Sequence, residues 1–201
     1  MKIKANFILL VLLFISLGLL AYTLYGFFWL KNSSSAMHGQ NLALSADNEI
    51  VTDRRAAAAK IGAVGSQHIH ADIKIYVNGK QMNFADNKYY MRSSFVHFDN
   101  QQNKADAGGV LHMHATGVPM WAVLKSLGME IGYNCLTLEN NEKLCNNNKQ
   151  MLKFFVNGKN VDDIENYVFK DLDKILVSYV DETGQQLIEQ IRSVTDYAKN
   201  H

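Results

Sequence analysis

The chain has 201 residues, of which 48% are hydrophobic and 10% aromatic, and it contains a single proline. Such a composition excludes a largely disordered protein, because an aromatic-rich chain can bury enough apolar surface to fold. The formal net charge is +1 and no run of basic residues occurs, which argues against nucleic acid as a partner.

The first segment of the chain predicts a transmembrane helix. Residues 7–30 contain no charged side chain. At a rise of about 1.5 Å per residue they span about 36 Å, more than the roughly 30 Å of a bilayer core. A cleavable signal peptide has a shorter apolar core of about 7–15 residues. The run ends in residues typical of a membrane interface, which are Tyr22, Tyr25, Phe27, Phe28 and Trp29. We therefore expect residues 1–31 to be a signal anchor that stays in the membrane.

The positive charges around this segment predict its orientation. Lys2 and Lys4 precede the apolar run, whereas after Lys31 no lysine or arginine follows until Arg54. Segments rich in lysine and arginine stay on the cytoplasmic side, so this bias favours a cytoplasmic N-terminus. We therefore expect a single-pass protein of the cell membrane whose C-terminal domain lies outside the cytoplasm.

The segment after the anchor is predicted to be a flexible linker. Residues 32–66 are mostly small and polar, with three consecutive serines at 33–35 and four alanines at 56–59. Such a composition gives little apolar surface to pack against a domain.

From Gln67 onward the apolar residues recur at every second position, which is the period of a β-strand. The first strand is expected over residues 69–77, and Asn78-Gly79 is a typical hairpin turn. Shorter strands are expected over 95–99 and 110–115. These strands begin the globular domain.

The second half of the chain predicts a helix followed by further strands. Pro119 is suited to the first position of a helix, and Gly128 is suited to the position just past its end. Residues 152–159 form a strand with a second Asn-Gly turn, and residues 175–180 form the last strand.

A C-terminal helix is expected over 182–201, because Thr183 and Gln186 resemble a capping box. The order of elements predicts an α+β fold over 67–181. We expect a small mixed β-sheet with one packed helix, in the general style of a β-grasp domain.

The two cysteines predict a structural disulfide. Cys135 and Cys145 flank a predicted hairpin with its turn near Asn140 and Asn141, which places them opposite each other. An oxidising compartment would join them, with a stabilisation of about 3 kcal/mol. A redox-active pair is usually Cys-x-x-Cys at a helix N-terminus, and this spacing differs from it.

The histidines are concentrated in one part of the sequence. Five of the seven fall between residues 68 and 114, and residues 68–70 and 112–114 each contain a His-x-His pair. On a strand, alternate side chains share a face, so both members of each pair point the same way. If their strands are neighbours, the imidazoles converge on one patch together with two carboxylates. The candidate metal ligands are His68, His70, His97, His112, His114, Asp72 and Asp99.

This set of side chains points to copper or zinc. Neutral imidazole binds both metals, copper(II) favours nitrogen-rich tetragonal sites, and zinc accepts three or four histidines in a tetrahedron. The sequence leaves both metals open. We therefore predict a membrane-tethered, extracytoplasmic metal-binding domain that acts as an accessory or chaperone protein.

Two alternatives remain open at this stage. In a structural or assembly subunit of a membrane complex, the histidines would only be polar residues on a solvated or interface-forming sheet face. A metal-dependent enzyme is the third hypothesis and is less favoured. Cupin-type enzymes follow their first His-x-His with a glutamate, which residues 73–77 lack, and no His-Glu-x-x-His, P-loop or Gly-x-Ser-x-Gly motif occurs.

The motifs together resemble a family of archaeal and bacterial membrane-anchored proteins of unknown activity, over about residues 67–182. The motifs are His68-Ile-His-Ala-Asp72, Val77-Asn-Gly-Lys80, Val96-His97-Phe-Asp99, His112-Met-His114-Ala-Thr-Gly117-Val118, Ser126-Leu-Gly-Met129 and Leu152–Lys159. Members often carry a protein-disulfide isomerase label, which the cysteine spacing here does not support. The resemblance implies an extracytoplasmic His-rich domain.

Overall fold

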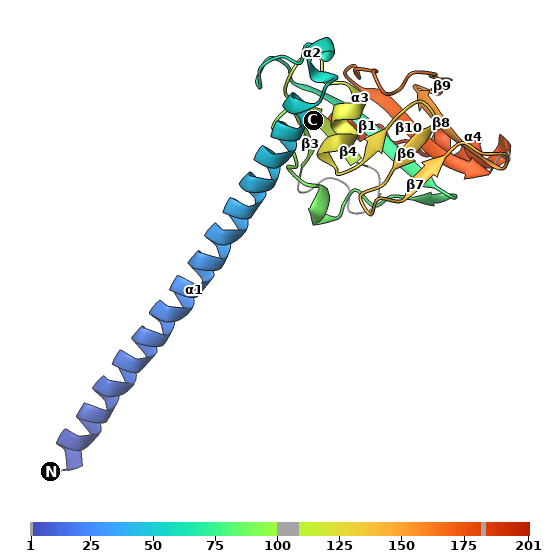
Figure 1. The fold of residues 1–201 in the computed structure, drawn as a ribbon. Coiled ribbons are helices and arrows are strands. Elements are labelled where there is room, and N and C mark those ends of the chain that lie inside the picture. The colour runs from blue at the N-terminus through green and yellow to red at the C-terminus, as the bar shows by residue number, and fades with distance from the viewer. Residues whose placement is uncertain (1, 100–108, 182–183) are drawn as a thin grey trace. The chain divides into compact units, whose positions relative to one another are not determined.

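The computed structural model describes residues 2–99, 109–181 and 184–201 (Figure 1). The described chain divides into two compact units, one up to Asn41 and the other over Leu42–His201. Helix α1 (Lys2–Thr52) contains the boundary between them. All the candidate metal ligands belong to the second unit.

The first unit is the N-terminal part of α1, and from Leu10 onward its large apolar side chains are exposed. Leu12, Phe14 and Leu19 are each more than half exposed. A helix that is apolar all round needs an apolar environment, and a bilayer supplies one. Among the described residues, one helix is long and apolar enough to cross a membrane, and it is α1. The predicted N-terminal apolar helix is therefore present.

Residues 32–66 differ from the flexible linker expected from the sequence. Helix α1 continues to Thr52, and from Leu42 onward the chain belongs to the second unit. Ala46 and Ile50, which are one helical turn apart, are buried there. Apolar residues four positions apart share a helix face, and their packing outweighs the modest helix propensity of the surrounding polar residues.

Within the second unit, polar contacts fix the chain on both sides of the end of α1 to the rest of the domain. The carboxylate of Asp47 accepts a hydrogen bond of 3.0 Å from the backbone N–H of Ser94. Asp53 forms an ion pair of 2.9 Å with Lys125, just before the single-turn helix α2 (Ala56–Ala59). The packed part of the segment therefore contributes to the fold.

The second unit is built on a mixed β-sheet, which has seven strands among the described residues. At its centre β1 and β10 run parallel, and the other neighbouring strands pair antiparallel. The predicted Asn-Gly turns follow β1 and β8, with positive φ at both residues of each. In spatial order the strands are β3 (Val96–Phe98), β4 (Gly109–Met113), β1 (Ile69–Val77), β10 (Asp173–Asp181), β8 (Gln150–Val156) and β9 (Lys159–Asn160), while β2 (Lys80–Gln81) pairs with β1.

One face of this sheet covers the main hydrophobic core. Ile73 and Ile75 of β1 and Leu111 of β4 point into it, and α3 (Met120–Ser126) packs there as well. Pro119 is the N-cap residue of α3, so the helix begins one residue later than the sequence suggested. The alternation of apolar side chains predicted this face correctly.

The other face is partly covered by the C-terminal elements. Helix α4 (Gly184–Ser193) contacts β10, and the 3-10 helix η2 (Tyr197–Asn200) contacts β1 and β4. Leu176 is buried on this face. The hydroxyl of Ser178 donates a hydrogen bond of 2.6 Å to the side chain of Gln190 in α4. The histidines lie on this second face, beside η2.

The C-terminal helix differs from the expected span of 182–201. It ends at Ser193, because the backbone N–H groups of Tyr197 and Ala198 donate to the carboxylate of Asp72 instead of continuing a helix. Thr183 of the predicted capping box lies outside the described residues.

A smaller antiparallel sheet carries the disulfide. Its strands are β5 (Glu130–Ile131), β6 (Cys135–Thr137) and β7 (Lys143–Cys145). Elsewhere in the unit, the 3-10 helix η1 (Asn87–Tyr89) precedes β3 of the larger sheet. Cys135 pairs directly with Cys145 across the hairpin, and their sulfurs are bonded as predicted. With the apolar helix, the mixed sheet, α3 and α4, the predicted α+β class is confirmed.

Candidate metal centre

Strand register places three histidines side by side. His97 on β3 is directly opposite His112 on β4, and His112 is directly opposite His70 on β1. Paired residues on neighbouring strands point to the same face of a sheet. The ring centroids of His97 and His112 are 6.0 Å apart, and those of His112 and His70 are 4.5 Å apart. These three side chains form one row across three strands.

Two further histidines form a second row on the same face. His114 directly follows β4, and its backbone N–H donates to the carbonyl of Phe95 at 2.8 Å. His68 directly precedes β1. Because each lies two residues from a member of the first row, alternation brings both rings to the same face. Their ring centroids are 4.9 Å apart, while Met113 points the other way and is fully buried.

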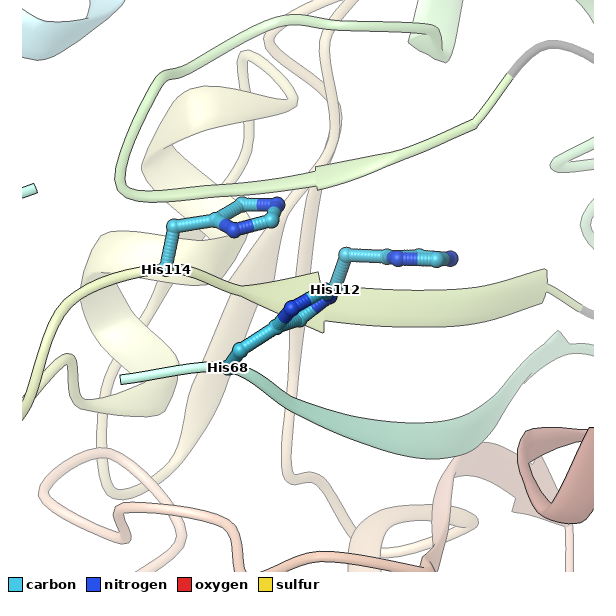
Figure 2. Close-up of side chains that lie close together, drawn as sticks. All are labelled: His68, His112 and His114. Atoms are coloured by element: carbon cyan, nitrogen blue, oxygen red, sulfur yellow. The ribbon is translucent and has the colours of Figure 1, made fainter. Parts of the chain in front are cut away.

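Three imidazoles from the two rows bring their nitrogen atoms together. One ring nitrogen each of His68, His112 and His114 lies within 4.8 Å of the others. Figure 2 shows His112 on β4, His114 on the segment directly after that strand, and His68 just before the neighbouring strand β1. Metal–nitrogen bonds of about 2.0–2.1 Å put nitrogens bound to one ion about 3–4 Å apart. Binding an ion would draw the three nitrogens closer together than they lie here.

The electrostatics of the cluster favour the neutral imidazoles that bind metals. His112 is only 5% exposed, and burial lowers its pKa to about 4 despite the opposing charge of Asp99. Burial also lowers the pKa of His70 and of His114, and the neighbouring imidazoles lower both further. A neutral ring keeps a lone pair for a metal ion, so protons compete weakly with metal at these positions.

His97 is oriented by a backbone carbonyl. Its Nδ1 is 2.9 Å from the carbonyl oxygen of Ser93, and because a carbonyl only accepts hydrogen bonds, Nδ1 carries the proton. Its Nε2 then faces the carboxylate of Asp99 at 3.3 Å, and Nε2 of His112 faces the same carboxylate at 3.6 Å. A histidine that donates one N–H to a carbonyl and presents the other nitrogen is typical of metal sites.

The carboxylate of Asp72, a predicted ligand, accepts hydrogen bonds from the C-terminal segment. Its Oδ1 accepts hydrogen bonds from the hydroxyl of Thr195 at 2.5 Å and from the N–H of Tyr197 at 3.0 Å. Its Oδ2 accepts from the N–H of Ala198 at 3.0 Å. The carboxylate is buried and binds the C-terminal segment to β1. We therefore assign Asp72 a structural role beside the cluster.

The structure brings a sixth histidine to the cluster that sequence reasoning missed. The ring centroid of His201 lies 5.2 Å from that of His112 and 5.7 Å from that of His70. The sequence predicted His201 only as the end of a C-terminal helix, and it was not among the candidate ligands. No local sequence pattern predicts that His201 reaches the cluster. Its position depends on the hydrogen bonds by which Asp72 holds the segment after α4 against the sheet.

The arrangement is that of a mixed α+β domain with a group of histidines able to hold a metal ion on one face of its sheet. No protein-family model, curated protein or solved structure matches this chain. The chemistry of the cluster is therefore the basis for assigning a function.

Proposed function

We propose that this chain is a membrane-tethered metal-binding protein that holds copper or zinc outside the cytoplasm. The observation that carries the proposal is the convergence of ring nitrogens from His68, His112 and His114 within 4.8 Å. Three histidines are a common donor set for zinc, and copper(II) also favours imidazole nitrogen. His97, with Asp99 beside it, and His70 complete a ligand-rich surface around that group.

The location rests on the anchor and the disulfide. The apolar part of α1 is long enough to cross a bilayer, and the lysine bias around it favours a cytoplasmic N-terminus. The bond between Cys135 and Cys145 supports the same placement, since disulfides persist in oxidising compartments outside the cytoplasm. The same features fit the family of anchored His-rich proteins that the motifs resemble, and membership in it is part of the proposal.

The role we propose is that of an accessory protein or metal chaperone for a membrane partner. One side of the cluster is accessible from the solvent, because His68 and His201 are exposed. His112 lies on the buried side. A site with exposed ligands can exchange its ion with a partner, whereas structural zinc sites are closed by four protein ligands. The anchor keeps the site close to the membrane in which such a partner lies.

Metal titration of the full-length protein in detergent tests the function. We expect about one equivalent of Zn(II) or Cu(II) to bind, measured by calorimetry and by metal analysis after desalting. His112→Ala and His114→Ala should each weaken binding by about tenfold or more, and His68→Ala should act in the same direction.

Two substitutions serve as controls. His38→Ala lies in α1 within the first unit, and Met113→Leu lies between two ligands but points into the core, so neither should change the affinity. A wild-type affinity no tighter than about 1 mM would contradict the proposal. A structural role for the histidines in a membrane complex would then be the better explanation.

A further inference from the structure

The last turn of the chain lies against the candidate metal centre. Helix η2 contacts β1 and β4, the strands that position four of the histidines. A metal–nitrogen bond of about 2.1 Å places two ligating rings at a tetrahedral angle with centroids about 5 Å apart. The ring centroids of His201 and His112 are separated by 5.2 Å, and those of His68 and His114 by 4.9 Å. His201 is thus placed at a distance suited to a shared ion.

Hydrogen bonds to the sheet hold the segment that places His201. The buried carboxylate of Asp72 accepts three hydrogen bonds from residues 195–198, as described above. Ala198 is buried beside it, and the N–H of His201 is 3.4 Å from the carbonyl of Ala198. Asp72 lies two residues from His70 on the same strand and the same face. Strand β1, which carries His70, therefore also fixes the turn that brings His201 to the cluster.

We propose that His201 is a further ligand of the metal ion at this centre and that Asp72 is the positioning residue that delivers it. The inference rests on the proposed metal-binding function. The group of His68, His112 and His114 supplies three nitrogens, and zinc and copper(II) both accept a fourth. His201 is exposed and follows a single short turn, so it is the ligand best placed to leave when the ion is passed on.

The test uses the full-length protein in detergent with Zn(II) and Cu(II) as probes. The variants are His201→Ala, Asp72→Asn and the double variant, with His38→Ala as the control. Affinity is measured by titration, and the number of coordinated imidazole nitrogens is measured by electron paramagnetic resonance of the copper(II) form. Circular dichroism checks the fold of each variant, and His201→Asn, a polar substitution at the same exposed position, repeats the ligand test.

We expect His201→Ala to weaken binding by about tenfold or more and to remove one nitrogen from the copper spectrum. Asp72→Asn should change the spectrum in the same way. It should also weaken binding in the wild-type background but not in the His201→Ala background, because its effect acts through His201. A merely structural role of Asp72 would lower affinity equally in both backgrounds.

Each contrary result has a distinct meaning. If the wild-type protein binds metal and His201→Ala leaves both affinity and spectrum unchanged, the ligand role is overturned while the metal-binding function stands. If Asp72→Asn weakens binding equally in both backgrounds, its positioning role is overturned. If the wild-type protein binds neither ion, the function and this inference both fail.

Discussion

The buried imidazole of His112 and the half-buried ones of His70 and His114 bind protons less readily in the folded chain than in the unfolded one. Burial lowers the pKa of each from its ordinary value of 6.5, in the case of His112 to about 4. In the unfolded chain these rings regain water and their ordinary pKa. The difference links the stability of the domain to pH.

The metal-free protein should therefore lose stability on acidification. Between pH 6.5 and about 4 the unfolded state binds protons that the folded state excludes at His112, so the free energy of unfolding falls as pH falls through this window. Above pH 6.5 these groups should contribute no pH dependence. Unfolding by denaturant at a series of pH values, after treatment with a chelator, measures the effect.

His112→Asn provides the comparison for this prediction, because asparagine does not titrate. The variant should show a shallower loss of stability between pH 6.5 and 4 than the wild type. Equal slopes for the two proteins would contradict the assignment of a lowered pKa to His112. Metal binding by the folded protein should weaken toward the acidic end of this range, where the pH approaches the lowered pKa of His112 and protons begin to compete for that ligand.

The candidate ligands differ in how far the sequence could predict their positions and contacts. The His-x-His pairs and His97 were predictable because alternation on a strand fixes the face of each side chain, and the strands proved to be neighbours. The position of Asp72 was predictable by the same rule, but its partners were not. The hydrogen bonds that occupy it come from residues more than 120 positions later in the chain. The proximity of His201 to the cluster could not be predicted either, because it depends on the same long-range hydrogen bonds.

At the scale of elements, periodicity and turn chemistry were reliable guides. The two Asn-Gly turns, the cysteine hairpin and the core face of β1 all follow from local rules. The packed part of residues 32–66 was missed, because its composition is that of a linker. What orders it is tertiary contact through Ile50 and Asp47, which no local pattern reveals.

The disulfide hairpin should stabilise the fold without taking part in metal binding. Replacing both Cys135 and Cys145 with serine should lower the free energy of unfolding by about 2–4 kcal/mol, since the unfolded chain gains freedom. The affinity for Zn(II) should not change, because β6 and β7 belong to a different sheet from β1 and β4. Denaturant unfolding and zinc titration of the same preparation measure both quantities.

Peptide mapping tests whether the disulfide forms in the cell. Peptide mapping without reductant should find the two cysteines cross-linked in protein taken from its native membrane. Free thiols there would argue against an extracytoplasmic domain.

For the whole molecule, the central prediction is that the apolar helix stays attached. Washing membranes with alkaline carbonate should leave the protein in the pellet, because residues 7–30 remain in the bilayer. N-terminal sequencing should find the chain uncleaved. A mature N-terminus near Ser35 would show instead that the segment is a signal peptide, and a soluble form should then appear.

The parallel pairing of β1 with β10 has a consequence for how the domain forms. Ala71 pairs with Asp173, a sequence separation of 173 − 71 = 102 residues, so the middle of the sheet closes through non-local contacts. Such contacts form late and slow the folding of a chain. If the chain is threaded across a membrane from its N-terminal anchor, as we propose, β1 can pair with β10 only after nearly the whole domain has emerged. The histidine face, which borders this pair, would then be completed only in the compartment where the protein works. Metal loading should accordingly depend on the ions of that compartment and not on those of the cytoplasm.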